Sequence, residues 1–283
     1  MVLASEYIIQ EKMKEIFLDE LKQIELEILK EFKNICDNHG FNYSILAGTL
    51  LGAVRHQGFI PWDDDIDVMM PRPDYELFKT YCLTNETSFS IICNETNPHY
   101  GYMFTKLYNP KTLLLEENSD RYNVEMGISI DVFIYDGMGD TRKQAIRAFN
   151  KSALEREILV AGNWKHYFKS KTHPWYYEPF RFALYLISRP FDYTNLIERI
   201  QRNYKEYDFY KCAYVGNLCS HKRSESIIER SCFDEYIELI FEGEKFKAFK
   251  GYETYLIAMY GDYMKLPPVE KRITHHTFKA YWK

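Results

Sequence analysis

Acidic residues crowd into one short stretch of the chain, residues 63–67, which reads DDDID and precedes the apolar run VMM. If this stretch forms a β-strand, alternate side chains share a face, so Asp63, Asp65 and Asp67 point together. Like charges held close together in a core are costly, and a hard divalent cation is a common compensation. The spacing therefore predicts a metal site with Asp65 and Asp67 as its main pair, Asp63 at its rim and Asp64 facing away.

A lone aspartate, Asp131, stands in a second apolar stretch, GISIDVFIYD at residues 127–136. A carboxylate inside an apolar strand needs a partner, which either a shared metal ion or an Arg or Lys side chain would supply. We favour the metal ion, which makes Asp131 the third carboxylate of the site. In that position it would also accept the proton of an attacking hydroxyl group.

Gly48 and Thr49 stand where a short predicted strand ends and helical turns that carry Arg55 and His56 begin. Glycine allows a ligand to approach the backbone closely, and the N–H groups at a helix start attract phosphate. Together with the carboxylates, this arrangement predicts a metal–phosphate site of the kind used in phosphoryl transfer. Arg72, just after the aspartate strand, is a further candidate for phosphate, and a surface arginine is the alternative.

The elements that must position these residues show both helical and strand periodicity. Helical spacing covers residues 9–38, 142–162, 175–188, 196–210 and 252–260, and strand patterns cover residues 43–47, 89–93, 100–108, 112–117, 127–136, 214–219 and 236–249. We predict an α+β fold in which helices flank a mixed β-sheet core. Its expected parts are a catalytic core with N-terminal helices at residues 1–139, a mainly helical insertion at 140–230, and a C-terminal hairpin, helix and tail that complete the core at 231–283.

The composition argues against several classes of protein. The net charge of −5 disfavours non-specific binding to nucleic acid, which needs clustered positive charge. Six scattered cysteines without a CxxC pair disfavour a zinc site and are typical of reduced thiols in the cytoplasm. The first residues lack the basic and apolar regions of a signal peptide.

An apolar and aromatic segment, residues 175–191, is too short and too interrupted by charge to span a bilayer. We expect it to form a buried helix, and a helix lying at a membrane surface is the alternative. The basic tail after residue 260 includes His275 and His276, which are within reach of a phosphate in principle. Adjacent side chains point apart on any regular element, so we expect no metal ion at this pair.

The motif at residues 48–67 resembles that of the LicD family, within the nucleotidyltransferase superfamily of DNA polymerase β type. The family's run stands here as GTLLG at residues 48–52, RH at 55–56 and GFIPWDDDID at 58–67. The segment YGDYMKLPP at residues 260–268 is similar to the family's C-terminal signature. The resemblance covers most of the chain and implies a nucleotidyltransferase-like core with a helical insertion.

The resemblance also implies an activity. LicD-like enzymes transfer phosphocholine, or a related phospho-alcohol, from CDP-choline or another CDP-alcohol donor to a sugar hydroxyl of a cell-surface glycan and release CMP. The expected acceptor is lipopolysaccharide, teichoic acid or a glycolipid precursor, and the expected cofactor is Mg²⁺, with Mn²⁺ as the alternative. Such an enzyme would work in the cytoplasm, with peripheral contact to the inner face of the membrane.

By position, the resemblance assigns roles to individual residues. The expected metal ligands are Asp65, Asp67 and Asp131, with Asp63 assisting, and Asp131 is the expected general base. The expected contacts to donor phosphate or sugar are Gly48, Thr49, Arg55, His56 and Lys106. Two alternatives stay open: a nucleotidylyltransferase that moves NMP from an NTP to a small hydroxyl acceptor, and a nucleotide-binding protein without catalysis.

Overall fold

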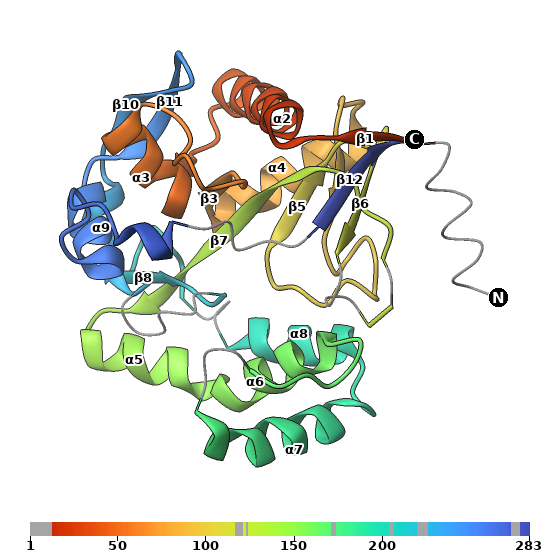
Figure 1. Cartoon of the computed structure of the whole chain (residues 1–283). Helices are drawn as coiled ribbons and strands as arrows, with labels where there is room; N and C mark the ends of the chain where they lie inside the picture. Colours follow the sequence, from red (N-terminus) through yellow and green to blue (C-terminus); the bar gives the residue numbers. More distant parts are fainter. Residues whose placement is uncertain are drawn as a thin grey trace.

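A mixed β-sheet lies at the centre of the computed structural model, which describes residues 13–116, 121–122, 124–170, 174–203, 207–219, 226–272 and 278–283 (Figure 1). Within these residues the sheet has seven strands, and β3 and β7 pair in parallel at its centre while the other neighbours pair antiparallel. The order is β2 (Ser44–Ile45), β3 (Asp67–Pro71), β7 (Ser129–Gly139), β5 (Thr105–Tyr108) and β4 (Ser90–Ile92), with β8 (Tyr214–Asn217) beside the later part of β7 and β9 (Ile228–Glu229) beside β8. This architecture confirms the predicted α+β class.

Helix α2 (Leu18–His39) covers the core because its apolar residues recur every three or four positions, as Ile24, Ile28 and Phe32 illustrate. Gly40 ends the helix in the left-handed region, with φ of 71°, as predicted. The prediction that the helix begins at residue 9 is wrong within the described residues. Residues 14–16 instead form strand β1, because they pair with the C-terminal strand and bury Ile16.

Three further helices and a hairpin surround the aspartate strand. Helix α4 (Arg72–Thr84) follows β3 directly, α3 (Ala47–His56) precedes it, and α9 (Tyr252–Tyr260) follows the hairpin of β10 (Tyr236–Phe241) and β11 (Glu244–Phe249). The hairpin turn has positive φ at both Glu242 and Gly243, the two residues between the paired strands. Gly261 ends α9, also as predicted.

A small three-stranded sheet joins distant parts of the chain. The C-terminal strand β12 (Phe278–Trp282) lies between β1 (Lys14–Ile16) and β6 (Thr112–Glu116) and pairs antiparallel with both. Figure 1 shows this sheet beside one end of α2. The ends of the described chain are therefore held by the middle of the sequence.

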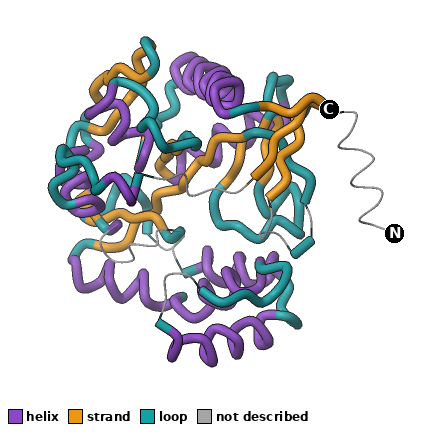
Figure 2. The backbone as a smooth tube through the Cα atoms, in the orientation of Figure 1, coloured by secondary structure: helices purple, strands orange, loops and turns teal. Residues whose placement is uncertain are grey.

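A layer of helices lies on the opposite side of the central sheet from α2 (Figures 1 and 2). It contains α5 (Arg142–Lys151), α6 (Ala153–Asn163), α7 (Glu178–Ser188) and α8 (Tyr193–Arg202). The 3-10 turns among the described residues are η1 (Trp175–Tyr177), η3 (Arg230–Phe233) and η4 (Val269–Lys271). The helices of the layer share a hydrophobic cluster separate from the main core. The predicted single helix over residues 142–162 is interrupted at Ser152, whose buried hydroxyl accepts a hydrogen bond from Asn203 Nδ2 at 2.7 Å. The division of the chain at residues 139 and 230 stays a prediction.

The expected burial of the apolar segment at residues 175–191 is wrong. Its helix α7 buries Leu184 and Ser188, whereas Trp175 is 83% exposed and Phe180 is 55% exposed. The helix packs against α6, which leaves its outer apolar residues uncovered. Among the described residues, no helix combines the length and the apolar character needed to span a membrane.

Candidate active site

The two aspartates predicted from separate strands lie side by side. Strands β3 and β7 are neighbours, and their parallel register sets Asp67 opposite Asp131. The backbone N–H of Asp131 donates to the carbonyl oxygen of Ile66 at 2.9 Å, which fixes this register at the first residue of β3. Since residues opposite each other share a face of the sheet, the two carboxylates project from the same surface.

The other three acidic residues are placed differently from the prediction. The strand begins at Asp67, so Asp63, Asp64 and Asp65 lie in the loop before it and do not alternate across a sheet. Asp64 is buried, at 4% exposed, and the expectation that it faces away from the site stays a prediction. The cause of the late strand start is the turn at Pro61, in which the N–H of Asp63 donates to the carbonyl oxygen of Ile60 at 2.9 Å and bends the chain before a strand can start.

Gly48 and Thr49 hold this acidic loop against α3. Both lie in the first turn of the helix, which begins at Ala47. The hydroxyl oxygen of Thr49 accepts a hydrogen bond from the N–H of Asp67 at 2.8 Å. A Cβ atom at Gly48 would collide with the carboxylate of Asp63. The glycine is therefore required by the close approach of an acid, and the threonine by the first residue of the aspartate strand.

Lys106 is the cationic partner of Asp131. It lies opposite Asp131 across strands β5 and β7, and its Nζ is 2.7 Å from Asp131 Oδ1. The same Nζ is 5.4 Å from the centroid of the Phe104 ring. The structure therefore gives Asp131 the lysine partner that was the alternative to a metal ion, and the metal ion stays a prediction.

Burial and neighbouring like charges together determine the electrostatics of the site. Burial raises the pKa of the Asp67 carboxyl well above its ordinary value, and the nearby charges of Asp65, Asp131 and Asp63 raise it further. Lys106 acts in the opposite direction and lowers this pKa. The site therefore holds more negative charge than its own lysine compensates.

Glu25 is a further buried acid near this cluster that the sequence did not single out. It lies on the apolar face of α2, one turn after Leu21, and is 4% exposed. Burial raises the pKa of its carboxyl well above the ordinary value, and Asp65, Asp64 and Asp131 raise it further. Its Oε2 atom has no hydrogen-bond partner within the described chain. The available signal was the acid itself, at a position where the helical period demands an apolar side chain.

The donor set suits a hard divalent cation, although the described side chains do not converge on one point. Carboxylate oxygens are the preferred ligands of Mg²⁺, which usually takes one or two of them together with substrate phosphates. Among residues outside the gaps named above, no three Asp, Glu, His or Cys side chains are grouped closely enough to hold a metal ion. The raised pKa of Asp67 and the orphaned oxygen of Glu25 are the observations that fit a cation, and Mg²⁺ or Mn²⁺ stays a prediction.

Arg55 and His56 connect the end of α3 to the chain that follows α9. Arg55 Nε donates to His56 Nε2 at 2.9 Å, and its Nη1 donates to the carbonyl oxygen of Tyr263 at 2.8 Å. Burial and the Arg55 charge lower the pKa of His56, so its unprotonated form is favoured. The structure thus assigns both residues contacts within the chain, and their phosphate role stays a prediction. His275 and His276 lie outside the described residues.

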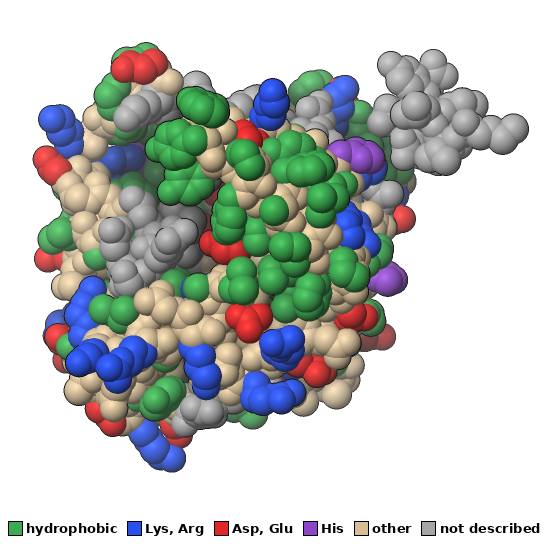
Figure 3. Space-filling view, turned by 90° about the horizontal axis from the view of Figure 1, so that it is seen from below, with side chains coloured by type: hydrophobic (Ala, Val, Ile, Leu, Met, Phe, Trp, Pro, Cys, Tyr) green, Lys and Arg blue, Asp and Glu red, His purple; other side chains and the backbone are tan. Residues whose placement is uncertain are grey.

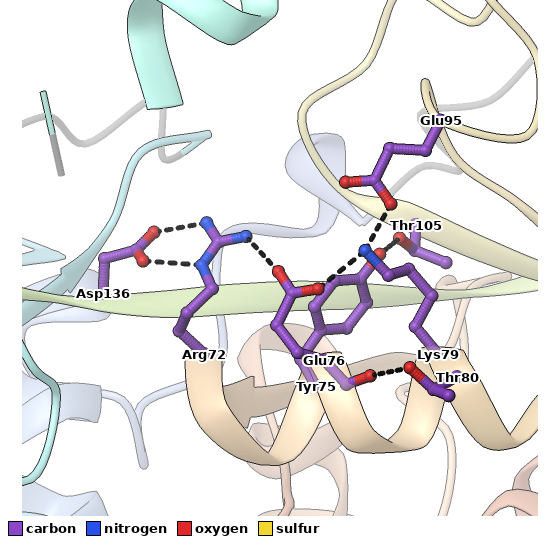
Figure 4. Close-up of polar contacts among 8 residues, drawn as sticks. All are labelled: Arg72, Tyr75, Glu76, Lys79, Thr80, Glu95, Thr105 and Asp136. Atoms are coloured by element: carbon purple, nitrogen blue, oxygen red, sulfur yellow. Dashed lines mark hydrogen bonds and ion pairs between the residues drawn. The ribbon is translucent and has the colours of Figure 1, made fainter. Parts of the chain in front are cut away.

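Arg72 belongs to a chain of ion pairs behind the sheet (Figure 4). Its Nε and Nη2 atoms each lie 2.7 Å from a carboxylate oxygen of Asp136, and its Nη1 lies 3.4 Å from Glu76. Lys79 continues the chain to Glu76 and Glu95. Alternation along β7 puts Asp136 on the opposite face from Asp131. Arg72 is therefore a partly buried arginine within an ion-pair network and not a surface arginine, and its phosphate role stays a prediction.

Comparisons with known proteins agree with this arrangement. The LicD/FKTN/FKRP nucleotidyltransferase domain matches residues 40–135, which include the acidic loop, β3 and most of β7. The lipopolysaccharide cholinephosphotransferase LicD of Haemophilus influenzae is 30% identical over 273 residues, which cover 95% of this chain and 99% of that protein. An uncharacterized protein of Rickettsia typhi, RT0683, is 39% identical over 64 residues, or 22% of this chain and 21% of that protein. The chain therefore belongs to the LicD family.

Proposed function

We propose that this protein transfers phosphocholine, or a related phospho-alcohol, from a CDP-linked donor to a sugar hydroxyl of a glycan and releases CMP. The observation that carries the proposal is that Asp67 and Asp131 lie opposite each other on the two central strands β3 and β7, next to Lys106. A relative aligned over almost its whole length is a lipopolysaccharide cholinephosphotransferase. Lipopolysaccharide or a similar glycan is accordingly the acceptor class that we propose.

Each residue of the site has a distinct task in this proposal. Asp67, Asp65 and Asp131, with Asp63 assisting, would hold Mg²⁺ or Mn²⁺, and such an ion neutralises charge on the transferred phosphoryl group. In this proposal Asp131 would also accept the proton of the acceptor hydroxyl. Lys106 Nζ donates to its Oδ1 and keeps the carboxylate ionised and oriented. Lys106 holds Asp131 in place and offers positive charge to the donor phosphates.

The N-terminal turn of α3 is the proposed phosphate-binding element. Its first N–H groups have no partners within the helix, and the helix dipole favours an anion there. Arg55 and His56 lie at the other end of α3, so we propose that they act on the sugar or the more distant phosphate of the donor. The proposal includes a cytoplasmic location, which the six free cysteine thiols support.

The test is an assay of products with purified protein, CDP-choline, Mg²⁺ and a lipopolysaccharide acceptor. The proposal expects CMP to form together with choline-labelled glycan, and chelation of the metal ion to stop both. If NTPs yield pyrophosphate and CDP-choline yields no CMP, nucleotidylyl transfer is the function instead. Binding of nucleotide without either product would identify a non-catalytic binding protein.

Matched variants tie the chemistry to the site. Asp131→Asn keeps the shape of the side chain and removes the base, so we expect CMP formation to fall by about 10²–10⁴-fold. Asp234→Asn is the control, because Asp234 forms an exposed ion pair with Arg230 away from the site. Activity of Asp131→Asn close to that of the control variant would refute the assignment of Asp131.

A further inference from the structure

The outer surface of α7 carries an unusual density of exposed aromatic and aliphatic side chains. Figure 3 shows hydrophobic side chains gathered on the side of the molecule that bears the helical layer. We call this set the α7 face, and its members are Phe168, Trp175, Tyr176, Tyr177, Phe180, Phe182, Leu186, Ile187 and Phe191. Large apolar patches of this kind usually mark a surface that binds a partner.

The α7 face is part of a well-anchored element. Leu184 and Ser188 are buried on the inner side of α7. Arg189 Nη2 donates to the carbonyl oxygens of Ala161, Gly162 and Trp164 at 2.9 to 3.1 Å, which ties the end of α7 to the end of α6. The exposed rings are therefore presented by a helix whose own core contacts are complete.

The charge around the α7 face is positive. Lys165 and Lys169 are exposed on the segment beside α7, and the guanidinium of Arg181 stacks 4.6 Å from the Trp164 ring centroid. The acid of the helix, Glu178, is turned inward: its Oε1 accepts a hydrogen bond from the N–H of Ser170 at 3.0 Å. Glu178 also accepts a hydrogen bond from the Tyr167 hydroxyl. Its charge is compensated by an ion pair with Arg181.

We propose that the α7 face docks on the surface of an anionic lipid bilayer. Trp and Tyr rings combine an apolar body with a polar group and favour the level of the lipid headgroups. Helices that lie in this interface pair such rings with lysine and arginine, which attract anionic lipids. A protein groove would cover the rings but would give no role to the exposed Lys165 and Lys169 beside them. Asp192, the exposed acid next to Phe191, is engaged as the N-cap of α8.

This inference goes beyond the proposed function, because it concerns where the protein works and requires no substrate. The helical layer lies on one side of the central sheet, so docking through α7 would orient the whole molecule relative to the bilayer (Figure 1). Vesicle binding is measured without donor or acceptor. A failure of docking therefore leaves the transfer reaction untouched, and a failure of transfer leaves docking untouched.

The test is sedimentation of the full chain with vesicles of phosphatidylcholine that contain about one third phosphatidylglycerol, against vesicles of phosphatidylcholine alone. We expect binding to the first and much weaker binding to the second. Phe180→Ser with Ile187→Ser should lower the affinity at least about tenfold. The control is Leu77→Ser with Ile257→Ser, since both residues are similarly exposed on α4 and α9, away from α7.

A second arm tests the charge and the position of the rings. Lys169→Gln should weaken binding to the anionic vesicles roughly fivefold, because each lysine near such a surface contributes about that factor. Trp175 emission should shift to shorter wavelength on binding, and Trp175→Phe should remove most of that shift. Equal binding to both vesicle types, or loss of binding in the control pair as well, would overturn the proposal.

The oligomeric state separates lipid from a second copy of the chain. The proposal expects a monomer in analytical ultracentrifugation without vesicles, for both the unaltered chain and the Phe180→Ser/Ile187→Ser pair. A dimer that this pair dissociates would identify the α7 face as a self-interface and overturn docking on lipid. A monomer that binds neither vesicle type would overturn it as well.

Discussion

At the scale of single residues, Glu25 makes a prediction about pH. Its carboxyl has a raised pKa in the folded protein, so folding favours the protonated form. Its contribution to stability is complete below the ordinary glutamate pKa of about 4.3 and declines as pH rises towards the folded pKa. Glu25→Gln removes this decline. We expect urea unfolding at pH 7.5 to show a larger free energy of unfolding for the variant than for the unaltered protein.

The comparison between two pH values isolates this effect. Well below about pH 4.3 the variant and the unaltered protein should have similar free energies of unfolding, since Glu25 is then protonated in both states. Glu27→Gln on the exposed side of α2 is the control and should leave the pH dependence unchanged. The same slope with pH in Glu25→Gln and in the unaltered protein would contradict the raised pKa.

Thr49 gives the second prediction at this scale. Its hydroxyl oxygen accepts the N–H of Asp67, the first residue of the aspartate strand, in a buried position. Thr49→Val keeps the shape and leaves that N–H without a partner, which should cost about 1–3 kcal/mol of unfolding free energy. Thr49→Ser should recover most of the loss in a chemical denaturation experiment. Equal stability of the valine and serine variants would show that the hydrogen bond is unimportant.

The residue types of the site were predictable from the sequence, but their arrangement was only partly so. The acidic stretch at residues 63–67 identified Asp67, and the lone acid in the apolar stretch at residues 127–136 identified Asp131. The sheet register brings them together. The strand was expected from residue 63 because apolar residues and acids alternate there, yet the turn before it delays the strand to Asp67. Glu25 escaped attention because its role depends on tertiary packing of α2 against the acidic loop.

At the scale of secondary-structure elements, an ion pair stabilises the point where α4 follows β3. Arg72 begins α4, and its Nε and Nη2 atoms each lie 2.7 Å from a carboxylate oxygen of Asp136 on β7. Breaking a buried pair leaves an uncompensated charge and commonly costs about 3–5 kcal/mol. We expect Asp136→Asn to lower the free energy of unfolding by that amount, measured by chemical denaturation.

A double variant separates the missing partner from the loss of packing. Arg72→Met with Asp136→Leu removes both charges, so it should be more stable than Asp136→Asn alone. The exposed pair of Arg230 and Asp234 gives the comparison, because Asp234→Asn should change stability by less than about 1 kcal/mol. Similar losses at Asp136 and Asp234 would contradict the structural importance of the buried pair.

Elements with strong local signals were predicted well, whereas those that depend on distant partners were not. The stop of α2 at Gly40, the hairpin turn at Gly243 and the span of α9 all follow from local turn chemistry. The burial of α7 was predicted wrongly because periodicity shows which face of a helix is apolar and cannot show whether another element covers it. Exposure is a property of the assembled layer.

At the scale of the whole molecule, the ends of the described chain are joined through β12. This strand lies between β1 and β6, and a pairing across such a sequence distance leaves no local pattern to read. Ala280 and Tyr281 are buried in β12, and Trp282 Nε1 donates to Glu20 Oε1 at 2.9 Å. The C-terminal strand therefore supports the start of α2, the helix that carries Glu25.

Removal of residues 278–283 should destabilise the entire core and not only its edge. The truncated chain loses the strand that pairs with both β1 and β6, and it uncovers apolar side chains. This should lower the free energy of unfolding by about 3–5 kcal/mol and the melting temperature by about 10 °C. Lys279→Ala is the control, because Lys279 is exposed on the same strand and its loss leaves the pairing intact. Differential scanning calorimetry should show one cooperative transition for the control at the unaltered temperature. If the truncated chain melts with the control, then β12 is peripheral and α2 is held by the central sheet alone.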